Sequence, residues 1–291
     1  MSEPVQVYIV HGFTMDDEGG NPAGVVLNAD ALSRRERQAI AAEMALSETA
    51  FFSHSDRADF KVEFYTPNRQ IPHCGHATIA SFFLLQQQGH IKCPLSSKET
   101  IEDVRKITFA KDGVFMEQKK PSFNTFAEDS EETAVIAEAL GTKSDAFANA
   151  PSVVSTGNPW LIVQLQSLEA LKGLSPDFPK LETLSGQLGT IGFYPYVLME
   201  DGSLKSRMFA PLFGIEEESA TGTAAGPCAC YHQHFVDPQK HRYDIYQGEL
   251  MTPPSPSHLI ARLNVGAGEI QNLMVGGQAA LKGTRELANV G

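Results

Sequence analysis

The sequence predicts an α+β protein of two similar domains, each a strand-rich sheet wrapped around one buried helix. Three observations support this prediction: the same order of landmarks occurs in both halves of the chain, short β-favouring runs outnumber helical patterns, and residues 77–85 are apolar on every face. A surface helix has a polar face, so a helix over residues 77–85 must be buried. With 291 residues, 42% of them hydrophobic, the chain is long enough to form two medium-sized cores.

The internal repeat rests on four pairs of landmarks that keep their order. Matched positions lie 137 (21 to 158), 142 (33 to 175), 144 (67 to 211) and 147 (75 to 222) residues apart, as loop insertions would cause. We interpret the repeat as a duplication, with one domain over 1–125, a second over 126–291, and a boundary between Lys119 and Ala150. The pairs are Gly20-Asn21-Pro22 with Gly157-Asn158-Pro159, Ser33-Arg34-Arg35-Glu36 with Ser175-Pro176, Phe64-Tyr65-Thr66-Pro67 with Met208-Phe209-Ala210-Pro211, and the turn at Gly75 with the turn at Gly222.

Each predicted element has a local signal. The two Gly-Asn-Pro turns each lead into a strand. A capping box at Ser33 opens a helix that reaches about Leu46, and Ser175-Pro176 predicts the start of its counterpart. The small residues of 223–231 predict a second buried helix, in which Pro227 is tolerated if it lies in the first turn. Further strands are predicted at Val5–Val10, Phe60–Phe64, Lys106–Phe109, Gly113–Met116, Tyr196–Met199 and Leu259–Leu263.

Composition limits the class of partner and the compartment. The 23 Lys and Arg against 35 Asp and Glu give a formal charge of −12, which repels nucleic acid and anionic lipid. The start of the chain has no leader pattern and no apolar run is long enough to span a bilayer, so we expect a cytoplasmic protein without a membrane partner. Part of the charge lies in the segment 123–149, read as an acidic inter-domain connection with a helix over 131–140 that Gly141 ends. Four scattered cysteines favour a reduced compartment over a disulfide framework.

Two glycine turns precede the two predicted buried helices. Gly75 and Gly222 can each present unpaired backbone N–H groups and the positive end of a helix dipole. If both faced one cleft between the domains, they would suit a small carboxylate. Alternatively, each glycine serves only a tight turn. Nucleotide-binding glycine motifs and the nucleophile elbow of hydrolases are absent from the sequence, so no cofactor is expected.

Four sequence blocks resemble the signature blocks of the phenazine-biosynthesis PhzF family, in the family order and over nearly the whole chain. The resemblance implies a fold similar to diaminopimelate epimerase and proline racemase: two pseudo-symmetric domains, each a mostly antiparallel or mixed sheet curled around a central helix, with the active site in the cleft. It also implies a homodimer. The blocks are Ser47-Glu48-Thr49-Ala50-Phe51-Phe52, Pro72-His73-Cys74-Gly75-His76-Ala77-Thr78, Arg207-Met208-Phe209-Ala210-Pro211 and Glu217-Glu218-Ser219-Ala220-Thr221-Gly222-Thr223-Ala224-Ala225-Gly226-Pro227.

The resemblance assigns roles to individual positions. The catalytic glutamate of the family falls on Glu48, which would act as general base. His76 and Glu218 would be its polar partners, although Glu218-Ser219 stands where the family commonly has Asp-Pro. The substrate-binding positions would be Cys74, Gly75, Gly222 and Thr223, the last three as donors to a bound anion.

The residue types favour one-base chemistry. Racemases of the resembled fold place a thiol at each glycine turn, whereas here Cys74 is matched by Thr221. The counterpart of Glu48, around residues 191–193, has no carboxylate, so we predict an isomerase or epimerase in which one carboxylate moves a proton between carbons of a small carboxylate-bearing metabolite. Cys74 is then an idle remnant, a buried apolar residue or a thiolate.

Two alternatives stay open. One is a binding or interaction protein that kept the fold without catalysis. The other is a zinc site, because the cluster around Cys74 and the pairs Cys228 with His232 and Cys230 with His234 carry ligand side chains, the pairs at helical spacing. No family metal motif occurs, so no metal is expected.

Overall fold

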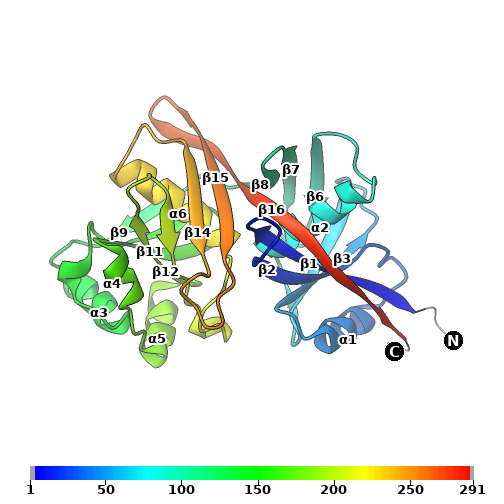
Figure 1. The fold of residues 1–291 in the computed structure, drawn as a ribbon, viewed down its shortest axis with the longest axis horizontal. Coiled ribbons are helices and arrows are strands. Elements are labelled where there is room, and N and C mark those ends of the chain that lie inside the picture. Colours follow the sequence, from blue (N-terminus) through cyan, green and yellow to red (C-terminus); the bar gives the residue numbers. More distant parts are fainter. Residues whose placement is uncertain (1–3, 289–291) are drawn as a thin grey trace. The chain divides into compact units, whose positions relative to one another are not determined.

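The chain divides into two compact units in the computed structural model, which describes residues 4–288 (Figure 1). The first unit contains residues 4–117 together with 276–288, and the second contains residues 118–275. Residues 276–288 thus belong to the same unit as the beginning of the chain, whereas the predicted division into 1–125 and 126–291 places them in the second domain. The mixed architecture of few helices and many strands confirms the predicted α+β class.

The sheet of the first unit closes on itself. Its strand order is β1-β2-β3-β4-β6-β7-β8-β16, and β16 also pairs with β1, where Val5 lies opposite Leu287. Closure removes free sheet edges and leaves an interior that α2 fills. The elements are β1 (Val5–Thr14), β2 (Asn21–Val26), α1 (Arg34–Met44), β3 (Glu48–Ser53), β4 (Phe60–Tyr65), β5 (Gln70–Ile71), α2 (Gly75–Gln87), β6 (Leu95–Glu99), β7 (Val104–Ala110), β8 (Gly113–Gln118) and β16 (Glu269–Leu287).

The second unit continues from the first part of β16 in the order β16-β15-β14-β13-β12-β11-β10-β9. Its elements are β9 (Ser122–Thr125), α3 (Glu131–Ala139), β10 (Ser152–Ser155), β11 (Pro159–Leu165), α4 (Leu168–Lys172), α5 (Phe178–Leu188), β12 (Gly192–Leu198), β13 (Leu204–Ser206), α6 (Gly222–Phe235), β14 (Arg242–Gln247) and β15 (Ser257–Gly266), with 3-10 turns at Ser144–Ala146 and Pro211–Phe213.

The two units repeat the same pairing pattern. In the first, β2 and β3 are parallel with α1 between them, and β4 and β6 are parallel with α2 between them. In the second, β11 and β12 are parallel with α4 and α5 between them, and β13 and β14 are parallel with α6 between them. A repeat in the pairing as well as in the sequence supports the duplication.

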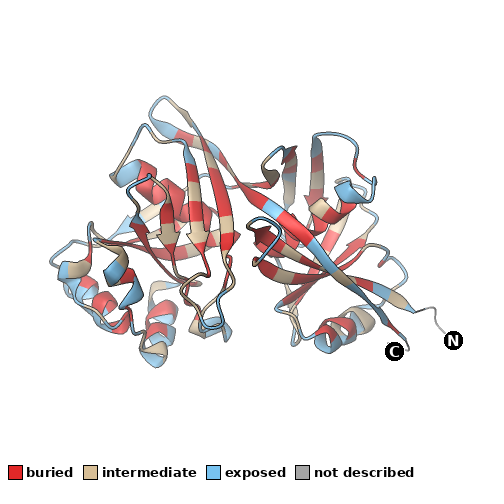
Figure 2. Ribbon diagram, in the orientation of Figure 1, coloured by how far each residue is buried: buried red, intermediate tan, exposed pale blue. Residues whose placement is uncertain are grey.

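Both helices that follow the glycine turns are buried, as predicted. All residues of α2 from Gly75 to Phe82 are buried, and α6 is red along most of its length in Figure 2. The lack of a side chain at Gly12 lets α2 pack closely against β1, because a Cβ added at Gly12 would lie 2.6 Å from the backbone oxygen of His76. Within residues 4–288 no helix has the length and apolar character needed to cross a membrane.

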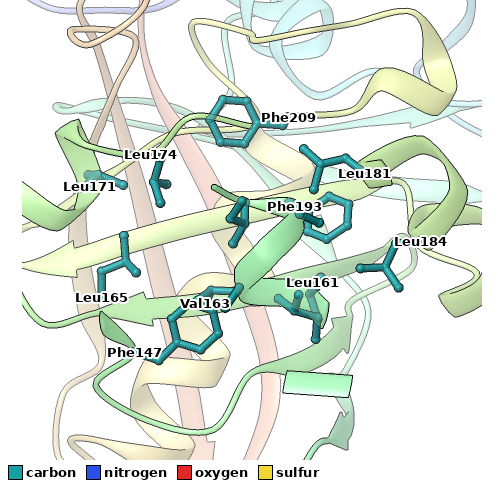
Figure 3. Close-up of a cluster of buried hydrophobic side chains, with 14 of the residues drawn as sticks. Phe147, Leu161, Val163, Leu165, Leu171, Leu174, Leu181, Leu184, Phe193 and Phe209 are labelled. Atoms are coloured by element: carbon teal, nitrogen blue, oxygen red, sulfur yellow. The ribbon is translucent and has the colours of Figure 1, made fainter. Parts of the chain in front are cut away.

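The outer helices cover an apolar core in each unit. In the first, Ile40, Ala41 and Met44 of α1 pack in a cluster with Val26 and Phe51. In the second, α3, α4 and α5 contribute to the cluster drawn in Figure 3, which gathers Leu171, Leu181 and Leu184 with Leu161, Val163, Phe193 and other buried side chains. Because Ile136, Ala137, Ala139 and Leu140 belong to that cluster, the reading of 123–149 as an inter-domain connection is wrong: α3 is part of the second unit's core.

Helix ends confirm one prediction and correct two. Ser33 caps α1 in a complete capping box, but Ala45 adopts a left-handed conformation that ends the helix before Leu46. α5 does not start at Ser175-Pro176; its cap is Asp177, and Pro179 lies in its first turn. α6 starts at Gly222, next to the predicted start, but Pro227 is its sixth residue and so lies beyond the first turn in which the prediction placed it.

Candidate active site

Three of the predicted site residues meet in the first unit because three elements begin at the same place. β2 and β3 run parallel, and Ala23 of β2 lies opposite Glu48, the first residue of β3. Cys74 is the N-cap of α2, and His76 is the second residue of that helix. The starts of parallel strands lie at one edge of a sheet, so the carboxylate from β3 and the thiol and imidazole from the start of α2 come from two separate chain segments to one location.

The central contact joins Glu48 to His76. Nε2 of His76 lies 3.2 Å from Oε2 of Glu48, and Sγ of Cys74 lies 3.5 Å from Nδ1 of the same ring. His76 is 4% exposed, Glu48 8% and Cys74 6%, so all three groups are buried. Ser47 also contacts Nε2, at 3.4 Å. The imidazole therefore lies between a carboxylate and a thiol.

The charges in this cluster determine which group can accept a proton. Burial alone would raise the pKa of Glu48, but the charge of His76 and hydrogen bonds from His76, Ser47 and Cys74 hold it below the usual value of 4.5. Burial opposes charge on His76, yet Cys74 and Glu48 raise its pKa well above 6.5. Burial, with the charge of Glu48, raises the pKa of the Cys74 thiol. A raised thiol pKa means that Cys74 is neutral, so Glu48 is the counter-ion of His76. Near neutral pH we assign a carboxylate at Glu48, an imidazolium at His76 and a thiol at Cys74.

Asn21, the first residue of β2, contacts the other side of the ring. Its Nδ2 atom lies 3.1 Å from Nδ1 of His76. An amide nitrogen requires an unprotonated Nδ1, whereas the ion pair with Glu48 favours an imidazolium with both ring nitrogens protonated. A 180° turn of the Asn21 amide reconciles the two, because it places Oδ1 against the Nδ1 proton.

The predicted residues of the second half lie in the second unit, around the start of α6. Thr221 is the N-cap of α6, as Cys74 is of α2, and its hydroxyl donates to Oε2 of half-buried Glu218 at 2.5 Å. Gly222 is the first helical residue and Thr223 the second. Glu218, which is followed by Ser219 where the resembled family commonly has proline, is thus tied to the helix start by this hydrogen bond.

A buried glutamine, missed by the sequence reasoning, holds this segment in place. Gln247 at the end of β14 donates from Nε2 to the backbone oxygen of Glu218 at 2.7 Å and to Oγ1 of Thr221 at 3.2 Å. Its Oε1 atom accepts from the backbone N–H of Thr221 and from the Tyr194 hydroxyl. Gln118 similarly donates to the backbone oxygen of Gly222 at 2.8 Å. Neither glutamine lies in a recognisable motif; Asn21 does, since it is the centre of the first Gly-Asn-Pro turn.

The predicted site residues therefore form two sets. Glu48, Cys74, Gly75 and His76 belong to the first unit, and Glu218, Gly222 and Thr223 to the second. Within each set the residues are neighbours at the start of the buried helix. That both sets face one cleft stays a prediction.

The register identifies the counterpart of Glu48. Ala23 follows Gly20-Asn21-Pro22 and lies opposite Glu48, while Trp160 follows Gly157-Asn158-Pro159 and lies opposite Gly192. Gly192 has no room for a side chain, since an added Cβ would lie 2.2 Å from the backbone oxygen of Phe209. The second unit cannot carry a carboxylate at the position equivalent to Glu48.

One group in the described chain, residues 4–288, could hold a metal ion. The ligand atoms of Glu48, Cys74 and His76 all lie within 4.8 Å of one another. The residues of the predicted zinc alternative in α6 form no such group in this range: His232 bonds the Tyr196 hydroxyl, and His234 stacks on Phe123. The thiol, imidazole and carboxylate suit a divalent ion such as zinc.

Comparisons with known proteins agree with this architecture. The sequence model of the phenazine biosynthesis-like protein family, PhzC-PhzF, matches residues 10–284. The chain is 34% identical over 236 residues to the uncharacterized isomerase YddE of Escherichia coli K12, covering 79% of each chain. It is 30% identical to the trans-2,3-dihydro-3-hydroxyanthranilate isomerase of Pseudomonas aeruginosa, over 90% of this chain and 91% of that one.

Solved structures show the same fold. A PhzF-family phenazine biosynthesis protein of Bacillus anthracis superimposes with a TM-score of 0.87 at 24% identity, covering 99% of this chain and 100% of that one. A hydroxyproline epimerase of Agrobacterium vitis superimposes with a TM-score of 0.64 at 14% identity, covering 100% and 94%. The family match, the isomerase relatives and the fold together show that the chain belongs to the phenazine biosynthesis-like family, PhzC-PhzF, and is an isomerase.

Proposed function

We propose that the protein is a cofactor-independent isomerase that moves a proton between two carbon atoms of a small carboxylate-bearing metabolite, with Glu48 as the only base. The observation that carries this proposal is the asymmetry between two equivalent positions. Glu48 is a buried carboxylate, and its counterpart Gly192 admits no side chain. Inversion of a stereocentre by two bases needs one on each face, whereas transfer on one face needs one.

The ionic state of the cluster suits this role. An anionic Glu48 takes a proton from a carbon atom of the substrate, whose electrons pass into the neighbouring π system. The neutral acid, whose proton exchanges with solvent, then returns a proton to a second carbon, and the double bond shifts. The ion-pair contact with His76 holds the carboxylate in place, and an imidazolium there cannot itself compete for the proton.

The substrate class follows from the donors and from one relative. Three donors lie at the N-termini of α2 and α6, helices of 13 and 14 residues: the backbone N–H groups of Gly75 and Gly222 and the hydroxyl of Thr223. A carboxylate is favoured at a helix N-terminus. The Pseudomonas relative is named for a dihydroaromatic amino acid. We therefore infer an unsaturated or cyclic carboxylic acid with an acidic C–H, bound with Glu218 and Cys74 as further contacts.

The test is hydrogen exchange at carbon. The protein is incubated in heavy water with a panel of small carboxylic, enamine and dihydroaromatic acids, and deuterium at carbon is followed by mass spectrometry and NMR. Exchange that disappears in Glu48→Gln supports the proposal. The matched control is Glu132→Gln, which removes an exposed carboxylate of α3 and should leave exchange unchanged.

Two outcomes would contradict the proposal. Exchange that persists in Glu48→Gln would assign the base elsewhere. Acids from the panel that bind with neither deuterium exchange nor a shifted double bond in the NMR spectrum would favour a binding protein on the same fold.

A further inference from the structure

A buried lysine lies beneath the start of α2. Lys98 of β6 has no exposed surface, and its Nζ atom lies 2.6 Å from Oγ1 of Thr78 and 3.1 Å from Nδ1 of His73. The ammonium also lies 4.8 Å from the centre of the Phe64 ring. Among residues 4–288 no carboxylate lies within ion-pair distance of Lys98.

The contacts of Lys98 lead to the active-site turn. Lys98 donates to the Thr78 hydroxyl, and this hydroxyl donates to the backbone oxygen of Cys74 at 2.6 Å. The second donor bond of Lys98 goes to the His73 ring. Lys98 therefore contacts both sides of the turn that carries Cys74 and His76.

A buried ammonium without a carboxylate partner is unfavourable for stability. Burial lowers the pKa of Lys98 to about 7. The positive charge of Arg105 lowers this pKa further, and Cys74 and Glu102 only partly offset the effect. Burial and the positive charges of Lys98 and Arg105 hold the pKa of His73 well below its usual value, so His73 accepts the hydrogen bond. An apolar side chain of similar length would fit this interior at lower cost. A residue that is unfavourable for the fold, and that contacts the site, points to a role in function.

We propose that Lys98 is a positioning residue that holds the turn over residues 73–78 so that His76 faces Glu48. The inference deepens the proposed function and rests on it for its kinetic test. Lys98 does not contact the proposed base; it acts through Thr78 and His73. Its charge titrates near neutral pH, so the bonds that it donates are strongest below about pH 7.

The kinetic test separates positioning from simple structural support. In Lys98→Met we expect kcat to fall on the order of 10- to 100-fold, because small displacements of a catalytic pair are costly. We expect KM to change little and the melting temperature to stay equal or rise. A fall in kcat that only parallels a lower melting temperature, or an unchanged kcat, would overturn the proposal.

A second variant covers the case in which Lys98→Met does not fold. Thr78→Val removes the hydroxyl between Lys98 and Cys74, and Ser81→Ala is its matched control, because the Ser81 hydroxyl makes the same kind of bond to Ala77 without contacting Lys98. A lower kcat in Thr78→Val than in Ser81→Ala supports the proposal, and equal values contradict it. In the double variant with Lys98→Met the effects should not add.

A spectroscopic readout keeps this inference separate from the proposed function. The ring ¹⁵N signals of His76, assigned by their loss in His76→Gln, report its protonation and contacts without any substrate. They should shift in Lys98→Met and stay in place in Ser81→Ala. Unchanged His76 signals would overturn the positioning role even if an isomerase substrate is found, whereas a shift without any substrate would leave it supported while the proposed function fails.

Discussion

Nε2 of His76 lies 3.2 Å from Oε2 of Glu48, and the two side chains are 4% and 10% exposed. The pair joins the start of a buried helix to the start of a strand, so its geometry is fixed by the backbone on both sides. In the second unit the strand starts at Gly192 and the second helical residue is Thr223, and neither can form such a pair. The pair that we propose as catalytic is therefore also the place where the two units differ.

Glu48→Gln should lower turnover by about 10²- to 10⁴-fold, the usual contribution of a general base. The amide keeps the shape of the carboxylate, so the circular dichroism spectrum and ligand affinity should stay close to those of the wild type. Turnover at the wild-type level would remove Glu48 from the mechanism.

Stability should depend on pH through this pair in two separate ranges. The pKa of Glu48 is lowered from 4.5, so its contribution is present above pH 4.5 and is lost as the pH falls through the folded-state pKa. The pKa of His76 is raised well above 6.5, so its contribution is complete below pH 6.5 and is lost as the pH rises through the folded-state pKa.

The melting temperatures of wild type and Glu48→Gln, measured from pH 3 to 10, should therefore differ most between the usual carboxyl and imidazole pKa values, roughly pH 5 to 6. A difference that does not vary with pH would show that the pair is not ionic.

His76→Gln should raise the pKa of Glu48, because the buried carboxylate loses its counter-charge. The acid limb of the pH–rate profile then moves to higher pH, and the free energy of unfolding falls by about 3 kcal/mol, as is typical when one partner of a buried ion pair is removed. Both effects are measurable, by the kcat profile and by urea denaturation. An acid limb at the wild-type position would indicate that another group titrates there.

Gln247→Leu should destabilise the second unit by about 1–3 kcal/mol, because buried donors and acceptors at Glu218 and Thr221 lose their partners. The exposed Gln187 of α5 offers a matched control, and Gln187→Leu should leave the melting temperature nearly unchanged. Equal melting temperatures for the two variants would mean that Gln247 does not hold the segment.

Zinc ions should inhibit the enzyme by binding Glu48, Cys74 and His76. Sγ of Cys74 lies 3.9 Å and Oε2 of Glu48 lies 3.2 Å from Nε2 of His76, separations compatible with ligands of one tetrahedral ion. Inhibition should strengthen as the pH rises, since the ligands must lose protons, and a chelator should reverse it. Cys74→Ala should be far less sensitive; equal sensitivity would place the inhibitory zinc elsewhere.

Much of the fold could be predicted because its signals are local or periodic. The uniform apolarity of residues 77–85 predicted a helix without a solvent face, and the Gly-Asn-Pro turns predicted β2 and β11. Predictions failed where the structure of a segment depends on residues outside its local pattern. Asp177 rather than Ser175 caps α5, and α3 joins a core although its segment has the charge of a linker.

For the site, the sequence by itself determined the residue types, their order and the missing second carboxylate. Only the tertiary structure brought Glu48, Cys74 and His76 together, because the parallel pairing of β2 with β3 and the burial of α2 depend on contacts between distant segments. It also decided the ionic states, since the pKa of a buried group depends on its neighbours: His76 lowers the pKa of Glu48, and Lys98, which no motif marks, lowers the pKa of His73.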